Sequence, residues 1–258
     1  MKTKLSVSML SVFLSLLLLS SCHTDAVQGE ESSTPTIPTA VLEECEDLGQ
    51  AYIDSFVFFG ESTTYHLKSR GVLSGGTETT QVWGPPGGTV NLDTTVGTLK
   101  IVYPESGELL TFGEAVRRKK PERILLCFGL NGAVGNVRKG KDYYKSCYEI
   151  LIQAVRQNSP DTEIYLQSAF PVAENMDMQY HSVSLDTLNG YIDTINSWSA
   201  ELALEHGIGY LNSAEVLKDE NGRLRTEYQV GDGYHLTAQA YDKILYYIRT
   251  HGKKGENV

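Results

Sequence analysis

Short apolar runs alternate with longer segments of helical periodicity through most of the chain. The runs are rich in β-branched or aromatic residues and end at polar or glycine positions, as strands buried on both faces do. They cover residues 55–59, 124–128, 163–167 and 207–211. Apolar residues recur at helical spacing over residues 142–157 and 185–205, and Thr237 is placed to cap a last helix. This alternation predicts a parallel sheet with helices on both faces, where sites collect at the carboxyl ends of the strands.

The region from residue 71 to 111 departs from this pattern because it is rich in glycine and threonine. We expect a strand at residues 81–83 and then a β-hairpin insertion around residues 89–103, built from alternating segments at 89–93 and 98–103. Residues 104–107 are typical of a turn, and a helix is expected at 112–120. No Gly-Lys-Ser/Thr or G-x-G-x-x-G pattern occurs here, so the glycines do not predict a phosphate loop.

The N-terminus has the features of a secretion signal. Lys2 and Lys4 precede an apolar stretch that ends in Leu19-Ser20-Ser21-Cys22, which resembles a bacterial lipobox. The stretch is interrupted by serines and is shorter than the roughly 20 residues that span a bilayer. We therefore expect a lipoprotein signal peptide at 1–21, a flexible tether at 22–39, a folded domain at 40–252 and a polar tail at 253–258. Lipidated Cys22 would anchor the protein to the outer side of a bacterial membrane.

Charge and cysteine content limit the classes of ligand and the bonds that the protein is expected to form. The formal net charge of −10 disfavours nucleic acid as a ligand. With Cys22 lipidated, Cys45, Cys127 and Cys147 remain, and an odd count predicts no disulfide framework. Cys127 and Cys147 fit apolar patterns and are expected in the core. No metal-ligand spacing is visible, so we expect neither metal nor cofactor, and the sequence indicates no protein partner.

Three short segments carry the chemistry. Ser62 follows Gly60 and Glu61 after an apolar run, Asn131 lies between Gly129 and Gly132 after another, and Asp232 precedes His235 near the C-terminus. Serine-based acyl transfer needs a hydroxyl beside an imidazole, a carboxylate that fixes the imidazole tautomer, and donors aimed at the developing oxyanion. Each segment alone is a weak signal. Their order and their placement at predicted strand ends favour a serine hydrolase.

With these residues in view, residues 52–250 resemble the SGNH or GDSL family of serine esterases and acylhydrolases. The match includes Gly60-Glu61-Ser62, with Glu61 where aspartate is usual, Gly129-Leu130-Asn131-Gly132, with Gly132 where a second aspartate is usual, and Asp232-x-x-His235. The resemblance implies a flavodoxin-like three-layer α/β/α fold. It also implies Ser62, Asp232 and His235 as catalytic residues. The implied oxyanion hole is formed by Ser62, Asn131 and a glycine, for which Gly84 is our candidate and Gly87 and Gly88 are rivals.

The sequence leaves a second candidate base and two other functions open. His66, four residues after Ser62, is the rival base, although we expect it to lie on the following helix and face away. We predict hydrolysis of small acyl esters, including O-acetyl groups on carbohydrate, with Trp83 as one residue able to stack on a sugar ring. The changes at Glu61 and Gly132 motivate a non-catalytic carbohydrate-binding lipoprotein as an alternative. An O-acyltransferase is a further alternative, because it forms the same acyl-enzyme.

Overall fold

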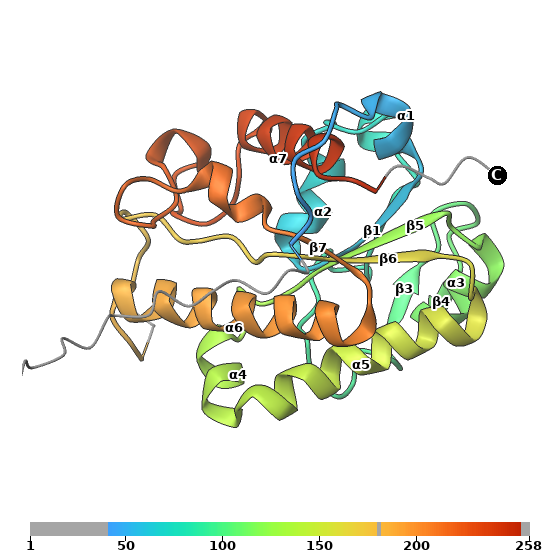
Figure 1. Cartoon of the computed structure of the whole chain (residues 1–258), viewed down its shortest axis with the longest axis horizontal. Coiled ribbons are helices and arrows are strands. Elements are labelled where there is room, and N and C mark those ends of the chain that lie inside the picture. The colour runs from blue at the N-terminus through green and yellow to red at the C-terminus, as the bar shows by residue number, and fades with distance from the viewer. Residues whose placement is uncertain (1–40, 180–181, 254–258) are drawn as a thin grey trace, which may run out of the picture. The chain divides into compact units, whose positions relative to one another are not determined.

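The computed structural model describes residues 41–179 and 182–253. Its centre is a five-stranded parallel sheet with the strand order β2-β1-β5-β6-β7 (Figure 1). The strands are β1 (Phe56–Gly60), β2 (Val82–Trp83), β5 (Arg123–Cys127), β6 (Glu163–Gln167) and β7 (Gly209–Leu211). The fold class predicted from the sequence is confirmed. The predicted lipid anchor, signal peptide and tether lie outside the described residues.

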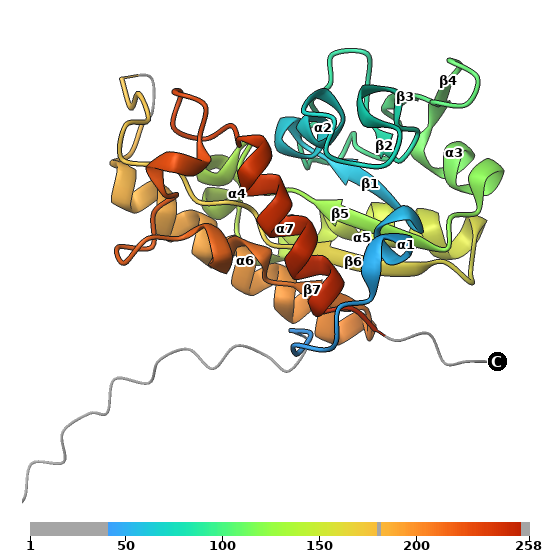
Figure 2. The same cartoon turned by 90° about the horizontal axis from the view of Figure 1, so that it is seen from above.

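Helices cover both faces of the sheet. One layer contains α1 (Gly49–Asp54), α2 (Ser62–Ser69) and α7 (Ala238–Thr250). The helix α7 lies in front of the strands in Figure 2. The other contains α3 (Phe112–Lys119), α4 (Ala133–Lys139), α5 (Lys141–Asn158) and α6 (Leu185–His206). Short 3₁₀ helices are η1 (Gly76–Glu78), η2 (Ser213–Leu217) and η3 (Thr226–Tyr228). Within the described residues, no helix is both long and apolar enough to cross a bilayer.

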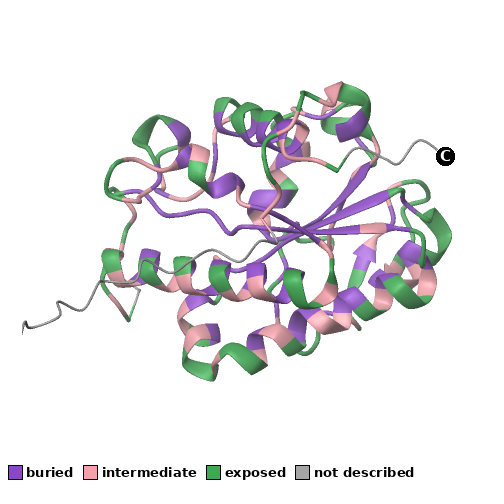
Figure 3. Ribbon diagram, in the orientation of Figure 1, coloured by how far each residue is buried: buried purple, intermediate pink, exposed green. Residues whose placement is uncertain are grey.

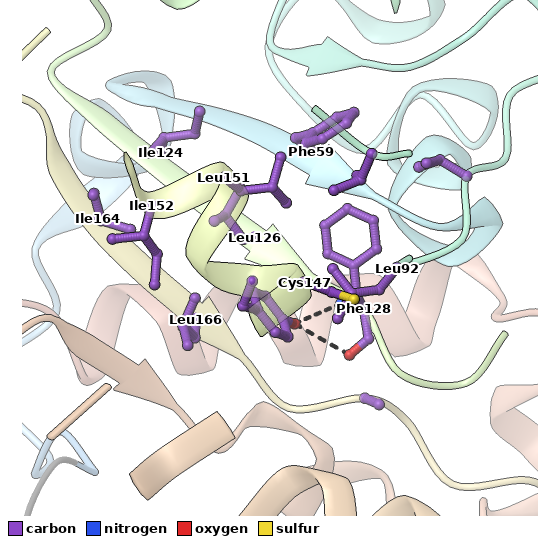
Figure 4. Packing of buried hydrophobic residues seen from close by; sticks show 14 of the residues in the cluster. Phe59, Leu92, Ile124, Leu126, Phe128, Cys147, Leu151, Ile152, Ile164 and Leu166 are labelled. Carbon is purple, nitrogen blue, oxygen red and sulfur yellow. Dashed lines mark hydrogen bonds between the residues drawn. The ribbon is translucent and has the colours of Figure 1, made fainter. Parts of the chain in front are cut away.

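The strands are apolar at nearly every position because each side chain enters one of two cores. Along β1, Val57 and Phe59 pack with α3 and α5, whereas Phe56 and Phe58 pack with α1 and α7. The central strands are accordingly buried throughout, while the helices alternate between buried and exposed positions (Figure 3). In the first core, Phe59 from β1, Leu126 from β5 and Leu166 from β6 pack beside residues of α5 (Figure 4). The buried cysteines Cys127 and Cys147 belong to these cores, as expected.

Local signals fix the ends of several helices. Thr111 and Glu114 form a capping box at the start of α3, in which each side chain bonds the backbone N–H of the other residue. The predicted cap of the last helix is confirmed, since the Thr237 hydroxyl accepts from the N–H of Ala240 at 3.3 Å. Gly207 ends α6 with a φ of 63°, a left-handed conformation that glycine adopts at little cost.

The predicted β-hairpin exists, but the predicted bounds of 89–103 are wrong. Its strands are β3 (Lys100–Val102) and β4 (Leu109–Thr111), which pair antiparallel across the predicted turn at 104–107. Residues 89–93 form no strand, although Val90 and Leu92 are buried as their alternation suggested. The Asp93 carboxylate accepts from the N–H and hydroxyl of Thr95, and this local turn ends the extended segment before it can pair.

Candidate active site

Ser62 lies where the chain leaves the sheet. It is the first residue of α2, and only Glu61 separates it from the end of β1 at Gly60. A Cβ at position 60 would approach the carbonyl oxygen of Cys127 to 2.2 Å and the Thr64 hydroxyl to 2.4 Å. Glycine is therefore required for β1 to run beside β5 and turn directly into α2. This tight junction places the Ser62 hydroxyl at the carboxyl edge of the sheet.

Asp232 and His235 lie on the loop between η3 and α7. The Asp232 Oδ1 atom accepts from the backbone N–H groups of Tyr234 at 3.1 Å and His235 at 2.9 Å. Its Oδ2 atom lies 2.7 Å from His235 Nδ1, and His235 Nε2 lies 3.1 Å from the Ser62 Oγ. The structure thus brings together the three residues that the sequence predicted as a relay, although Ser62 and His235 are 173 residues apart.

Asp232 is suited to remain ionised. Partial burial alone would raise its pKa, but the N–H groups of His235 and Tyr234 and the His235 imidazole bond the charged form, and the net shift of the Asp232 pKa is downward. An ionised carboxylate at Nδ1 selects the tautomer that carries its proton on that nitrogen. The lone pair of Nε2 then faces the Ser62 hydroxyl, which is the arrangement a general base needs.

Asn131 lies on the loop between β5 and α4, and its amide Nδ2 donates to the Thr89 hydroxyl at 3.1 Å. The backbone of this loop is bound by Glu61. One Glu61 carboxyl oxygen accepts from Gly129 N at 2.8 Å, and the other accepts from Asn131 N at 3.0 Å. The sequence indicated neither Glu61 nor Thr89 as a functional residue. For Glu61 the available signals were its position beside Ser62 and its place in the family motif, where aspartate is usual.

The Glu61 side chain is almost completely buried, with 2% of the residue exposed. Burial raises the pKa of its carboxyl to about 8, and the backbone N–H groups of Asn131, Gly129 and Leu130 oppose that rise. Gly132, the second departure from the family pattern, caps the start of α4 with a φ of 75°. An aspartate would be strained in that left-handed conformation, so glycine suits the local backbone here.

Gly84 lies at the carboxyl end of β2, directly after the pair between Phe59 and Trp83 that aligns β2 with β1. Its carbonyl accepts from Val102 N at 2.9 Å. The rival Gly88 has the ring of Tyr65 against it, since a Cβ there would lie 3.0 Å from ring carbons. Gly84 therefore shares the sheet edge with Ser62, and its role in an oxyanion hole stays a prediction.

His66 does not face away, and that expectation is wrong. It lies on α2 as predicted, but its ring centroid is 4.5 Å from that of His235. Residues spaced four apart share one face of a helix, so His66 projects on the side of α2 that carries Ser62. Burial, followed by the neighbouring His235 and Arg70, lowers the pKa of His66. His235, which contacts Ser62, is therefore the better placed base.

A cavity of about 390 Å³ adjoins these residues. Its lining includes residues 130–134, at the end of the loop after β5 and the start of α4, together with Met176, Leu188 and Tyr234. The Tyr234 ring, which lines the cavity together with Asn131, lies 4.1 Å from the ring of His235, so the cavity adjoins the predicted base. Trp83 takes no part, because it is 1% exposed and packs against Tyr103 and Phe112. The idea that Trp83 stacks on a sugar is thus wrong.

No group of three or more His, Cys, Asp or Glu side chains that could hold a metal ion occurs among residues 41–179 and 182–253.

Comparison with known proteins identifies the class. The model of the GDSL-like lipase/acylhydrolase family matches residues 58–243, and the chain belongs to this family. It is an ester hydrolase of the SGNH type. The comparison with curated proteins gave no match.

Solved structures resemble the chain at low identity. A catalytic mutant of an acetylxylan esterase from Geobacillus stearothermophilus is 15% identical, with 77% of this chain and 94% of the other covered and a TM-score of 0.42. A GDSL-like lipase from Bacteroides thetaiotaomicron is 22% identical, with 52% and 63% covered and a TM-score of 0.39.

Proposed function

We propose that this chain is a serine esterase that hydrolyses small acyl esters through Ser62, His235 and Asp232. The observation that carries the proposal is the continuous hydrogen-bonded path from carboxylate to hydroxyl. Its two links measure 2.7 Å from Asp232 to His235 and 3.1 Å from His235 to Ser62. Both distances lie within the range for a working base and nucleophile.

In the first half-reaction the Ser62 Oγ attacks the ester carbonyl while His235 Nε2 takes the hydroxyl proton. Asp232 stabilises the resulting imidazolium and keeps the ring in position. His235 then returns the proton to the departing alcohol, which leaves an acyl group on Ser62. In the second half-reaction His235 activates water, which attacks the acyl-enzyme and releases the acid.

The negative charge that develops on the carbonyl oxygen needs hydrogen-bond donors. We assign this role to the Asn131 Nδ2 group, the Ser62 backbone N–H and the Gly84 backbone N–H. The first N–H groups of a helix have no partner within the helix, so the start of α2 can offer its Ser62 N–H to an anion. Asn131 and Gly84 follow the strands on either side of β1, so donors can approach the same oxygen from both sides.

As substrate we propose small acyl groups, such as acetyl, esterified to carbohydrate. Two tyrosines near Ser62 support this choice. Tyr65 lies one helical turn after Ser62 and is 38% exposed, and Tyr234 lines the cavity beside His235. Tyrosine rings can pack against sugar rings and also present a hydroxyl for hydrogen bonding.

The purified protein should hydrolyse p-nitrophenyl acetate, because p-nitrophenol departs readily without specific contacts to the part of the site that binds the alcohol. Release of p-nitrophenol would be followed by absorbance, with and without an acceptor sugar present. Acetate as the main product supports hydrolysis, and acetylated sugar as the main product would instead establish the O-acyltransferase alternative. Absence of turnover over a range of p-nitrophenyl esters and acetylated glycans would contradict the proposal and favour the carbohydrate-binding alternative.

We also propose that the enzyme is anchored outside the cytoplasm through Cys22. Because Leu19-Ser20-Ser21-Cys22 resembles a lipobox, Cys22→Ser should shift the protein from the membrane fraction to the soluble fraction of an expressing bacterium. Immunoblots of the two fractions provide the measurement, and Cys45→Ser is the matched control that should stay with the membrane. Retention of Cys22→Ser in the membrane would show that lipid on Cys22 does not hold the protein there.

A further inference from the structure

Asn131 is bound from two sides by residues that are distant in sequence. Its backbone N–H donates to Glu61, and its side-chain amide donates to Thr89 at 3.1 Å. Glu61 precedes Ser62 directly, and Thr89 belongs to the glycine-rich segment that follows β2. The loop that carries the proposed oxyanion donor is therefore connected to the junction that carries the proposed nucleophile.

The Glu61 carboxyl has an unusual environment for a structural residue. It is buried, and no lysine, arginine or histidine among the described residues forms an ion pair with it. Burying an acidic group without an opposite charge costs free energy unless hydrogen bonds compensate. Its partners are backbone N–H groups of the Asn131 loop, at 2.8 Å for Gly129 and 3.0 Å for Asn131. Stability alone does not account for a carboxyl group here, whereas precise placement of this loop does.

The loop needs such support because glycines flank Leu130 and Asn131. Gly129 has a φ of 142°, and a Cβ there would lie 2.6 Å from Ile195 and 3.0 Å from Ala169. Gly132 has a φ of 75°. Glycine has few backbone preferences of its own, so contacts from other elements must define the path of the chain. Glu61 makes two such contacts, one on each side of Leu130.

Thr89 acts on the other end of the same residue. An asparagine Nδ2 carries two hydrogens, and one of them is directed to the Thr89 hydroxyl. The second hydrogen is then available to the substrate. Rotation of the amide by half a turn would present Oδ1, which repels a developing oxyanion. In the observed arrangement the Thr89 hydroxyl accepts from Nδ2, and this hydrogen bond restrains the Asn131 side chain.

We infer that Glu61 and Thr89 are positioning residues that act through Asn131: Glu61 fixes its backbone and Thr89 fixes its side-chain amide. The inference rests on the proposed function, because it concerns the oxyanion contact of that reaction. It also explains how the chain functions with glutamate at position 61. The longer side chain of glutamate reaches two N–H groups of a neighbouring loop.

The exposed Thr89 offers the cleaner test. Thr89→Val removes the hydroxyl and keeps the shape, so kcat for p-nitrophenyl acetate should fall about three- to tenfold with little change in KM. Thr89→Ser is the matched control, since it keeps the hydroxyl and should stay within about twofold of the wild type. Glu61→Gln keeps one acceptor but turns an N–H donor toward the loop, so above the Glu61 pKa of about 8, where both carboxylate oxygens accept, its kcat should fall about tenfold or more.

A double-variant comparison separates positioning from general structural damage. If both residues act through Asn131, then Thr89→Val and Glu61→Gln should have little further effect on kcat in an Asn131→Ala background. A structural role would lower kcat by the same factor in either background. Melting temperatures show which variants fold. If Glu61→Gln does not fold, the comparison of Thr89→Val with Thr89→Ser decides the test.

The outcomes distinguish a failure of this inference from a failure of the proposed esterase function. Loss of activity in Thr89→Val but not in Thr89→Ser, together with non-additivity toward Asn131→Ala, supports the inference. Equal kcat values for wild type and Thr89→Val, or fully additive effects, would overturn it while leaving the esterase proposal intact. A wild-type protein that turns over no ester overturns both.

Discussion

Ser62→Ala and His235→Ala should each abolish nearly all ester hydrolysis. Removal of the nucleophile or of its base from a hydrogen-bonded relay costs kcat on the order of 10⁶-fold in serine hydrolases. The 3.1 Å contact between the Ser62 Oγ and His235 Nε2 is the reason to expect the full effect here. Initial rates with p-nitrophenyl acetate, corrected for buffer hydrolysis, provide the measurement. Asp232→Asn should retain more activity, because it alters the tautomer without removing a reacting group.

Two further measurements show whether the three residues act as a unit. The Ser62→Ala/His235→Ala double variant should be little worse than either single variant, since one missing member already stops the relay. A fluorophosphonate probe should label Ser62 in the wild type and label it far more slowly in His235→Ala. His66→Ala is the matched control for the base, because it removes the imidazole beside His235 and leaves the hydrogen bond between His235 and Ser62 in place. Labelling of the active enzyme at another residue would contradict the assignment.

Asn131→Ala should lower kcat by about 100- to 1000-fold with a smaller change in KM. Loss of one oxyanion-hole donor raises the barrier by roughly 3–4 kcal/mol, because the hydrogen bond gains most of its strength as charge develops on the carbonyl oxygen. Asn131 and Tyr234 line the same cavity, and Glu61, which directly precedes Ser62, accepts from the Asn131 backbone N–H at 3.0 Å. Steady-state kinetics over a range of ester concentrations separate kcat from KM.

Asn136→Ala provides a comparison on the same segment of chain. Asn136 is buried in α4 and lies outside the residues that line the cavity. The Asn136→Ala variant should have a lower melting temperature than the wild type, whereas its kcat should stay close to the wild-type value. An Asn131→Ala variant that folds and keeps its kcat would remove Asn131 from the oxyanion hole and leave Gly84 and Ser62 as its donors.

Local patterns predicted most of the secondary structure. The strand expected at 163–167 is β6 with the same bounds, and the helix expected at 185–205 is α6, one residue longer. Both succeed because a strand buried on two faces and a helix with one apolar stripe each leave a distinct periodicity. The alternating pattern at residues 89–93 predicted a strand that the structure does not contain. The alternation reflects burial of Val90 and Leu92, while pairing depends on a partner strand that the sequence does not reveal.

The amino-acid sequence by itself determined the chemistry that this protein can bring together. The spacing of Asp232 and His235 allows one loop to carry both the proposed orienting carboxylate and the proposed base, and Thr237 starts the helix that follows them. Gly60 before Ser62 marks a tight exit from a strand. These features depend on residues that are close in sequence, so residue type and spacing suffice to predict them.

Only the tertiary structure decided which side chains support that chemistry. Glu61 is a buried partner of the Asn131 loop, His66 contacts His235, and Trp83 is a core residue. Thr89 reaches the Asn131 amide across 42 residues of sequence. Each of these contacts joins elements that follow different strands. The contacts of Glu61 and Thr89 depend on the order in which β2, β1 and β5 lie side by side, which is set by packing of the whole sheet and by no local pattern.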